Sequence, residues 1–126
     1  MQLDPNAAVA ANNLAWIYAE SGTHLEVALQ LARTAHSKLP STPEVSDTLG
    51  FLFYKTDQAD QAIQTLKPIV EQNPSNALYH SHLGLAYAKA GDATQARQHL
   101  TRALDLNGSF AGAAEAKAAL NSLQPR

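Results

Sequence analysis

Histidine is the side chain in this sequence best suited to bind a metal or move a proton, and there are five histidines. His80 and His82 are two positions apart, and residues two apart on a helix point to different faces, so this pair does not predict chelation. His24, His36 and His99 lack ligand spacing, and there is no cysteine to complete a site with them. The histidines are therefore expected to be solvated or packed side chains, and we expect no metal and no cofactor.

Acidic residues close to expected helix starts are the other candidates for chemistry. Asp57 with Asp60, and Asp92 with Gln95, have the spacing of residues that cap helices. The sequence contains no recognisable Ser–His–Asp set and no glycine-rich phosphate loop. We therefore expect a protein that is not an enzyme.

The composition argues against several kinds of partner. The 126 residues carry a net charge of -2 and have a pI of about 6.2, which argues against nucleic acid and against an anionic membrane surface. No apolar run approaches the roughly 18 residues of a membrane span, and no signal peptide is recognisable, so we expect no direct membrane insertion. The lack of cysteine excludes disulfides and thiol chemistry.

The elements that would position binding residues form an internal repeat. Residues 83–96 read LGLAYAKAGDATQA, and residues 49–62, which lie 34 positions earlier, read LGFLFYKTDQADQA. In both stretches an apolar stripe at helical spacing is followed by a break and by the start of a second helix. A helix pair that returns at a fixed period is typical of an α-solenoid.

This pattern resembles the tetratricopeptide repeat (TPR), a 34-residue helix–turn–helix unit. The family frame has Leu followed by a small residue, then an aromatic residue, a small residue early in the second helix, and a proline near the end. In the first repeat the matching residues are Leu14, Ala15, Tyr18, Ala28 and Pro40, with one extra residue near Thr23. In the second repeat they are Leu49, Gly50, Phe53, Ala62 and Pro74. In the third repeat they are Leu83, Gly84, Tyr87 and Ala96, with Gly108 in place of the proline.

The resemblance implies an all-α, right-handed α-solenoid of three TPR units with a C-terminal capping helix. The units are residues 8–42, 43–76 and 77–110, preceded by a remnant of an earlier repeat in residues 1–7 and followed by the capping helix and tail in residues 111–126. The capping helix is expected to turn one apolar face inward, made of Ala113, Ala116, Leu120 and Leu123.

Local signals predict how individual helices begin and end. The first helix is expected from about Ala7 to Glu20. Thr23 (with Glu26 in a capping box), Asp57, Asp92 and Thr42 are each expected to cap a helix start. Pro68 lies within a second helix, where a proline costs about 3 kcal/mol, so a kink or an early helix end is expected there.

In the TPR family the first helix of each unit lines a concave surface, so the resemblance implies which side chains face a ligand. The positions that we carry over are Val9, Asn12, Trp16, Ala19 and Glu20 in the first unit; Glu44, Asp47, Phe51, Tyr54 and Lys55 in the second; and Leu78, Ser81, Leu85, Ala88 and Lys89 in the third. The binding groove is expected to use Asn12, Trp16, Glu20, Asp47, Phe51, Tyr54, Lys55, Ser81, Leu85 and Lys89.

Trp16, Phe51 and Leu85 occupy equivalent positions and would form an apolar ladder along this groove. The alternative is that these side chains pack between neighbouring first helices as part of the core. Both interpretations fit Trp16, whereas Phe51 and Tyr54 are expected in the groove. The groove interpretation predicts that Phe51→Glu abolishes binding without unfolding the chain.

The expected partner is a protein or peptide segment of apolar or amphipathic character. Family members that clamp a C-terminal carboxylate use lysine, arginine and asparagine at the positions held here by Asn12, Trp16, Asp47, Phe51, Ser81 and Leu85. Those six residues include no cation, and a carboxylate clamp needs fixed positive charge. The function expected is therefore non-enzymatic protein binding; the alternative is a structural spacer or self-assembly segment of a longer array.

Two expectations concern the wider protein. The outer face of the first helix has no partner in this sequence, which predicts a homodimer or a domain swap through this N-terminal face. The stretches NNLAW, HLGLAYAKAGD and EAKAAL are similar to the C-terminal repeats of bacterial TPR proteins, including TPR lipoproteins of PEP-CTERM and exopolysaccharide systems. The resemblance implies a bacterial source and leaves cytoplasm and periplasm open.

Overall fold

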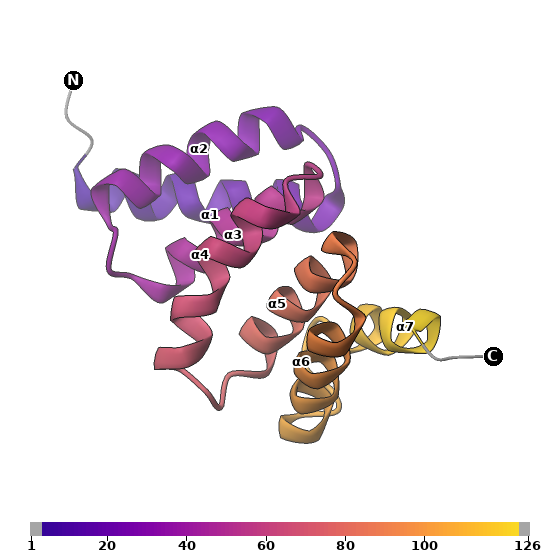
Figure 1. Ribbon diagram of the computed structural model, residues 1–126. Helices are drawn as coiled ribbons and strands as arrows, with labels where there is room; N and C mark the ends of the chain where they lie inside the picture. The colour runs from indigo at the N-terminus through magenta and orange to yellow at the C-terminus, as the bar shows by residue number, and fades with distance from the viewer. Residues whose placement is uncertain (1–3, 124–126) are drawn as a thin grey trace.

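The computed structural model describes residues 4–123, and all regular structure in this range is α-helical (Figure 1). The helices are α1 (Pro5–Ser21), α2 (Leu25–Lys38), α3 (Pro43–Lys55), α4 (Ala59–Gln72), α5 (Ala77–Ala90), α6 (Ala93–Leu106) and α7 (Ala113–Leu123). They match the helices expected from the repeat, and the expected all-α solenoid is confirmed.

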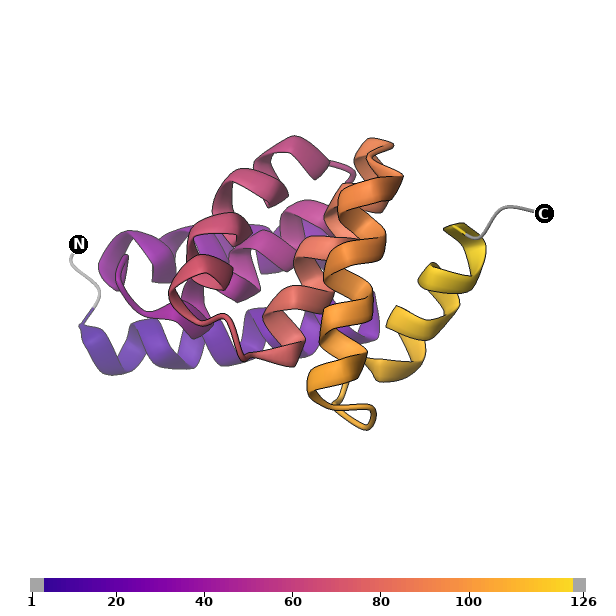
Figure 2. The same ribbon diagram turned by 60° about the horizontal axis from the view of Figure 1, so that its bottom comes forward.

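Consecutive helices form three pairs, α1 with α2, α3 with α4, and α5 with α6. Each pair packs on the next, and the first helices α1, α3 and α5 also contact one another in that order. Figure 2 shows the pairs following one another along the molecule, with α7 beyond α6. The expected inner face of α7 packs as predicted, because Ala113 and Ala116 are buried and Leu120 and Leu123 are partly buried.

In the second and third helix pairs, close approach of the two helices depends on a glycine in the first helix. A Cβ atom at Gly50 would lie 2.5 Å from Cγ of Leu66, and one at Gly84 would lie 2.8 Å from Cγ of Leu100. Both leucines are fully buried. The small residue of the repeat therefore leaves room for a leucine of the partner helix, which is why the two occur together in both units.

Some helix starts differ from the sequence-based expectation. Asp92 caps α6 as predicted, since its carboxylate accepts from the backbone N–H of Gln95 at 3.1 Å. The prediction of a capping box at Thr23 is wrong. The residue before α2 is His24, which has a positive φ of 51°, and the Thr23 hydroxyl forms a hydrogen bond with the Ser21 hydroxyl instead. Asp57 does not cap α4 either, because Gln58 holds that position.

Two further helix boundaries also differ. α1 begins at Pro5, where the missing N–H is harmless in a first turn, and Asp4 caps it by accepting from the N–H groups of Asn6 and Ala7. Residues 5–7 are thus helical, and residues 1–3 of the expected remnant lie outside the described residues.

Helix α4 runs through Pro68 to Gln72, so the prediction that this helix ends early at the proline is wrong. Thr42 precedes α3 but makes no side-chain capping bond.

A pair of histidines joins α5 to α6 and to the turn before α5. The Nε2–H of His80 donates to the carbonyl oxygen of Pro74 at 2.7 Å, and Nδ1 of His80 lies 3.1 Å from Nδ1 of His99. One of these two Nδ1 atoms carries the hydrogen and donates to the other. Burial lowers the pKa of His99, and His80 and Lys67 lower it further. His99 is therefore held as the neutral form.

The free energy of unfolding is expected to fall as the pH is lowered through about 6.5, the ordinary pKa of histidine. The folded-state pKa of His99 lies below its unfolded value, so this contribution is complete above the unfolded pKa and is lost as the pH falls toward the folded one. Urea unfolding at pH 7.5 and pH 5.5 measures the change. His99→Gln should reduce it, and the same pH dependence in that variant would contradict the assignment.

Candidate functional site: the concave groove

Two cavities lie along the first helices and together form what we call the concave groove. The larger cavity, about 480 Å³, is lined by Asn12, Asn13, Trp16, Glu20, Glu44, Asp47, Thr48, Asn76, Leu78, Tyr79 and Ala111. The smaller, about 270 Å³, is lined by Trp16, Glu20, Phe51, Lys55, Leu78, His82, Ala111, Gly112, Ala114 and Glu115. Because Trp16, Glu20, Leu78 and Ala111 line both, the two cavities are adjacent parts of one groove.

Four rings from three helices form an aromatic cluster: Trp16 of α1, Phe51 of α3 and His82 of α5, which line the groove, and Tyr54 of α3, which lines neither cavity. Phe51 stacks on His82 with ring centroids 4.0 Å apart, and Trp16 lies 5.6 Å from both. Tyr54 also stacks with Phe51, with ring centroids 5.7 Å apart. The cluster joins successive first helices through ring contacts.

The expected apolar ladder is divided between the core and the groove. Phe51 and Leu85 are only 4% and 3% exposed, since neighbouring first helices approach closely at this position, whereas Trp16 is half-buried. Trp16 is therefore the ladder residue that a ligand can contact most fully. A glutamate at 51 would be buried among rings, so Phe51→Glu is expected to unfold the chain rather than only block binding.

Of the polar residues expected at equivalent positions of the groove, Asn12 and Asp47 line the larger cavity, whereas Ser81 lines neither cavity. Nδ1–H of His82 donates to Oδ1 of Asp47 at 2.8 Å, and both side chains are buried. Asn12 and Ser81 occupy the positions equivalent to Asp47 and are also buried. Neither Oδ1 of Asn12 nor Oγ of Ser81 has a hydrogen-bond partner within residues 4–123. A buried polar atom left without a partner costs about 1–3 kcal/mol.

The two lysines expected in the groove have different surroundings. Lys89 Nζ donates to the Tyr54 carbonyl oxygen and to Oδ1 of Asp57, at 3.0 Å each, and lies 4.4 Å from the centre of the Tyr54 ring. Asp57, which was expected to cap α4, is thus used to hold Lys89. Lys55 lies over the Phe51 ring at 5.2 Å and lines the smaller cavity. Of the two, Lys55 is the cation placed to meet a ligand.

Several lining residues were missed by the sequence analysis, among them His82 and Glu115. His82 was considered only as a metal ligand, although it follows Ser81 directly and its ring stacks on that of Phe51. Glu115 of α7 lines the smaller cavity. Adding the 34-residue period to Ser81 gives residue 115, so the repeat register contained this signal. Burial, followed by the charge of Glu115, raises the pKa of Tyr54, which places this carboxylate near the aromatic cluster.

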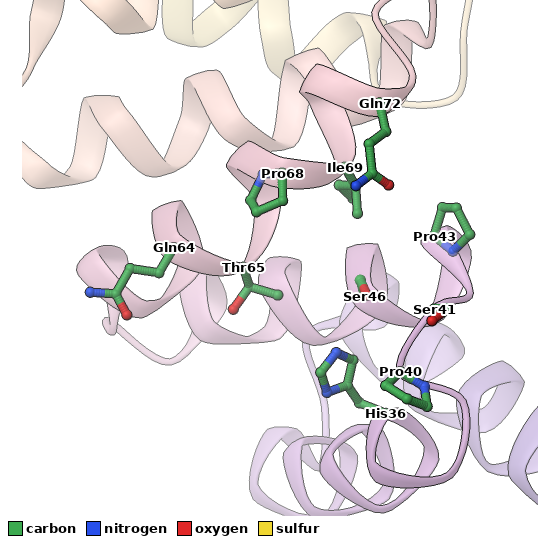
Figure 3. A pocket seen from close by; sticks show the side chains of 10 residues that line it. All are labelled: His36, Pro40, Ser41, Pro43, Ser46, Gln64, Thr65, Pro68, Ile69 and Gln72. Atoms are coloured by element: carbon green, nitrogen blue, oxygen red, sulfur yellow. The ribbon is translucent and has the colours of Figure 1, made fainter.

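A further cavity of about 520 Å³ lies away from the groove, beside the turn between α2 and α3 (Figure 3). Its walls come from α2, α3 and α4, and include His36, Pro40, Ser46, Gln64 and Pro68. Figure 3 shows Pro40 and Pro43 beside the turn and Pro68 on α4. Lysine, arginine, aspartate and glutamate are missing from its lining, so it offers hydrogen bonding without an ionic anchor.

The described part of the chain shows no group of three or more His, Asp or Glu side chains that could hold a metal ion. Within the same residues, no helix has the length and apolar character needed to cross a membrane.

Solved structures with similar folds support this description. The first TPR domain of human RPAP3 superposes with a TM-score of 0.73 at 18% identity, covering 95% of this chain and 97% of that one. The TPR protein TTC0263 of Thermus thermophilus gives a TM-score of 0.75 at 25% identity, covering 95% of this chain and 63% of that one. These structural similarities are evidence for the fold alone.

Curated relatives match part of the chain. The peroxisomal targeting signal receptor of Saccharomyces cerevisiae is 30% identical over 92 residues, which are 70% of this chain and 15% of the receptor. The receptor of the same description from Candida glabrata is 34% identical over 68 residues, which are 54% of this chain and 12% of that receptor. This chain therefore corresponds to a small part of the curated relatives that it matches.

Family models agree with the repeat register. One tetratricopeptide repeat model matches residues 23–86, which is more than half of the chain, and a second matches residues 77–110, the bounds expected for the third unit. The helix pairs, the glycine–leucine contacts and the line of first helices are what such a match requires. This chain belongs to the tetratricopeptide repeat family.

Proposed function

We propose that this chain is a non-enzymatic interaction module that binds a segment of a partner protein in the concave groove. The observation that carries the proposal is the pair of adjacent cavities along the first helices, with the half-buried Trp16 between them. A segment of protein chain is long and narrow, so it fits a groove that continues across α1, α3 and α5 better than a compact molecule does.

The chemistry of the groove favours an amphipathic segment. Trp16 and Leu78 give both cavities an apolar wall, while Glu20, Glu44 and Lys55 place charges on their edges. The match to receptors for a targeting signal agrees with recognition of a protein segment. The lack of cations in the larger cavity argues against a carboxylate clamp there.

Trp16→Ala is expected to weaken binding about 10-fold or more, because a half-buried ring in the centre of a groove is typical of a binding hot spot. Peptides would first be selected from a random library with the parent chain, and their affinities measured by isothermal titration calorimetry. Leu78→Ala, which shortens the apolar wall of both cavities, should weaken the same peptides.

The matched control is Ile17→Ala, since Ile17 follows Trp16 on α1 but is exposed and does not line the groove. Circular dichroism would verify that each variant is folded. Parent-like affinity in the folded Trp16→Ala and Leu78→Ala variants would overturn the groove as the binding site.

The alternative function, self-assembly, is supported by one observation. The exposed large apolar side chains of the described residues all lie in the first helix pair, namely Val9, Leu14, Ile17 and Val27. At the other end of the solenoid α7 packs on α5 and α6. The homodimer through the N-terminal face stays a prediction, and light scattering of the purified chain would show a dimer that forms with rising concentration.

A further inference from the structure

The larger cavity of the groove has a one-sided charge. Three carboxylates line it, those of Glu20, Glu44 and Asp47, whereas lysine, arginine and histidine are missing from its lining. Asp47 is bonded to His82, but Glu20 and Glu44 are exposed and form no ion pair with any residue in 4–123. Two carboxylates without partners beside an apolar wall attract positive charge and repel negative charge.

A second and independent feature of the same cavity is an acceptor without a donor. Asn12 lines the cavity and is 8% exposed, and its Oδ1 has no hydrogen-bond partner among the described residues. A buried acceptor of this kind is normally bonded, so its free state points to a donor that is supplied from outside the chain. Oδ1 itself is closed off from solvent, so a bound N–H group reaches it only when the Asn12 amide turns over toward the cavity.

The rings of the cavity suit a cation as well. Trp16 lines one side, and an indole face is the most favourable aromatic surface for an ammonium or guanidinium group. Tyr79 lines the cavity too, and burial, followed by the charges of Glu44 and Asp47, raises its pKa to about 12. The direction of that shift agrees with a negative potential at this wall.

We propose that the larger cavity selects a partner segment that carries a lysine or arginine, and that it holds this side chain against Trp16 between Glu20 and Glu44, where an N–H reaches Asn12 once its amide has turned over. The inference rests on the proposed function, because it specifies the chemistry of the segment bound in the groove. The smaller cavity shares Glu20 and adds Glu115, but it also contains Lys55, so the demand for a cation is stronger in the larger cavity.

The test compares three chains against one probe, a random library of displayed 12-residue peptides. The first is the parent, the second carries Glu20→Gln and Glu44→Gln, and the third carries Glu26→Gln and Glu71→Gln. Glu26 and Glu71 are exposed on α2 and α4 and line neither groove cavity, so the third chain has the same net charge as the second. Circular dichroism would verify that all three are folded.

The parent and the third chain are expected to enrich peptides with a lysine or arginine at one fixed position, and the second chain to lose this preference. For a selected peptide, replacing that residue with glutamine should lower the affinity for the parent about 10-fold and change the affinity for the second chain much less.

Three other outcomes would each contradict the inference. Enrichment of peptides by the parent without a basic residue would overturn the inference and leave groove binding standing. An equal loss in the second and third chains would also overturn it, because the effect would then follow net charge rather than the cavity. If the folded parent enriches no peptide, the proposed function itself fails, and the inference fails with it.

Discussion

Leu66→Ala is expected to lower the free energy of unfolding by about 2–5 kcal/mol, the range found for large-to-small changes in well-packed cores. Leu66 is fully buried in α4 and fills the space above Gly50 of α3. Removing most of its side chain leaves a cavity at the centre of the middle helix pair. Urea unfolding followed by circular dichroism gives the free energy directly.

The same contact predicts an interaction between two substitutions. Gly50→Ala places a methyl group within 2.5 Å of Leu66 Cγ, so it is expected to destabilise the parent by about 1–3 kcal/mol, partly offset by the better helix propensity of alanine. In the Leu66→Ala background the added methyl enters vacated space. The double variant should therefore be more stable than the sum of the single effects allows, and strict additivity would contradict the close contact.

Asp47→Ala is expected to destabilise the chain by about 1–3 kcal/mol, because it leaves the buried Nδ1–H of His82 without an acceptor. This contact joins α3 to α5, so its loss removes a polar link between two successive units. Thermal and urea unfolding at pH 7.5 measure the effect.

The matched control for this prediction is Asp47→Asn, which keeps an oxygen acceptor of the same shape. That variant should retain more stability than Asp47→Ala, since the hydrogen bond survives in neutral form. If the alanine variant were as stable as the parent, His82 would have to find another acceptor, and the polar link would not be a source of stability.

The repeat register explains how much of the fold the sequence predicted. The 34-residue period gives helix pairs because each unit brings its own apolar stripe and its own break, and the second and third units add a small residue opposite a leucine, at Gly50 and Gly84. These are local signals, and the helices follow them closely.

Helix starts were predicted less reliably from local sequence where the expected capping side chain has another hydrogen-bond partner. Thr23 has the sequence of a capping residue, but its hydroxyl bonds Ser21, and the chain passes through a left-handed conformation at His24. Asp57 is likewise left-handed and bonds Lys89 from the next unit. A partner 32 residues away cannot be read from the residues around a helix start.

The register places the ten expected groove residues on the first helices, and six of them line the two cavities, whereas Tyr54, Ser81, Leu85 and Lys89 line neither. The burial of each residue depends on how closely neighbouring units approach, which the frame does not contain; Phe51 therefore lies in the core while Trp16 stays accessible. The contact between Asp47 and His82 joins unlike positions of two units, so no single repeat reveals it.

Trp16 gives this protein a built-in spectroscopic reporter. It is the only tryptophan in the chain, it borders both groove cavities, and its ring lies 5.6 Å from the imidazole of His82. Indole emission responds to the polarity of its surroundings and to nearby side chains, and here no second tryptophan adds a background signal. Filling of the groove can therefore be followed by the emission of the unlabelled protein.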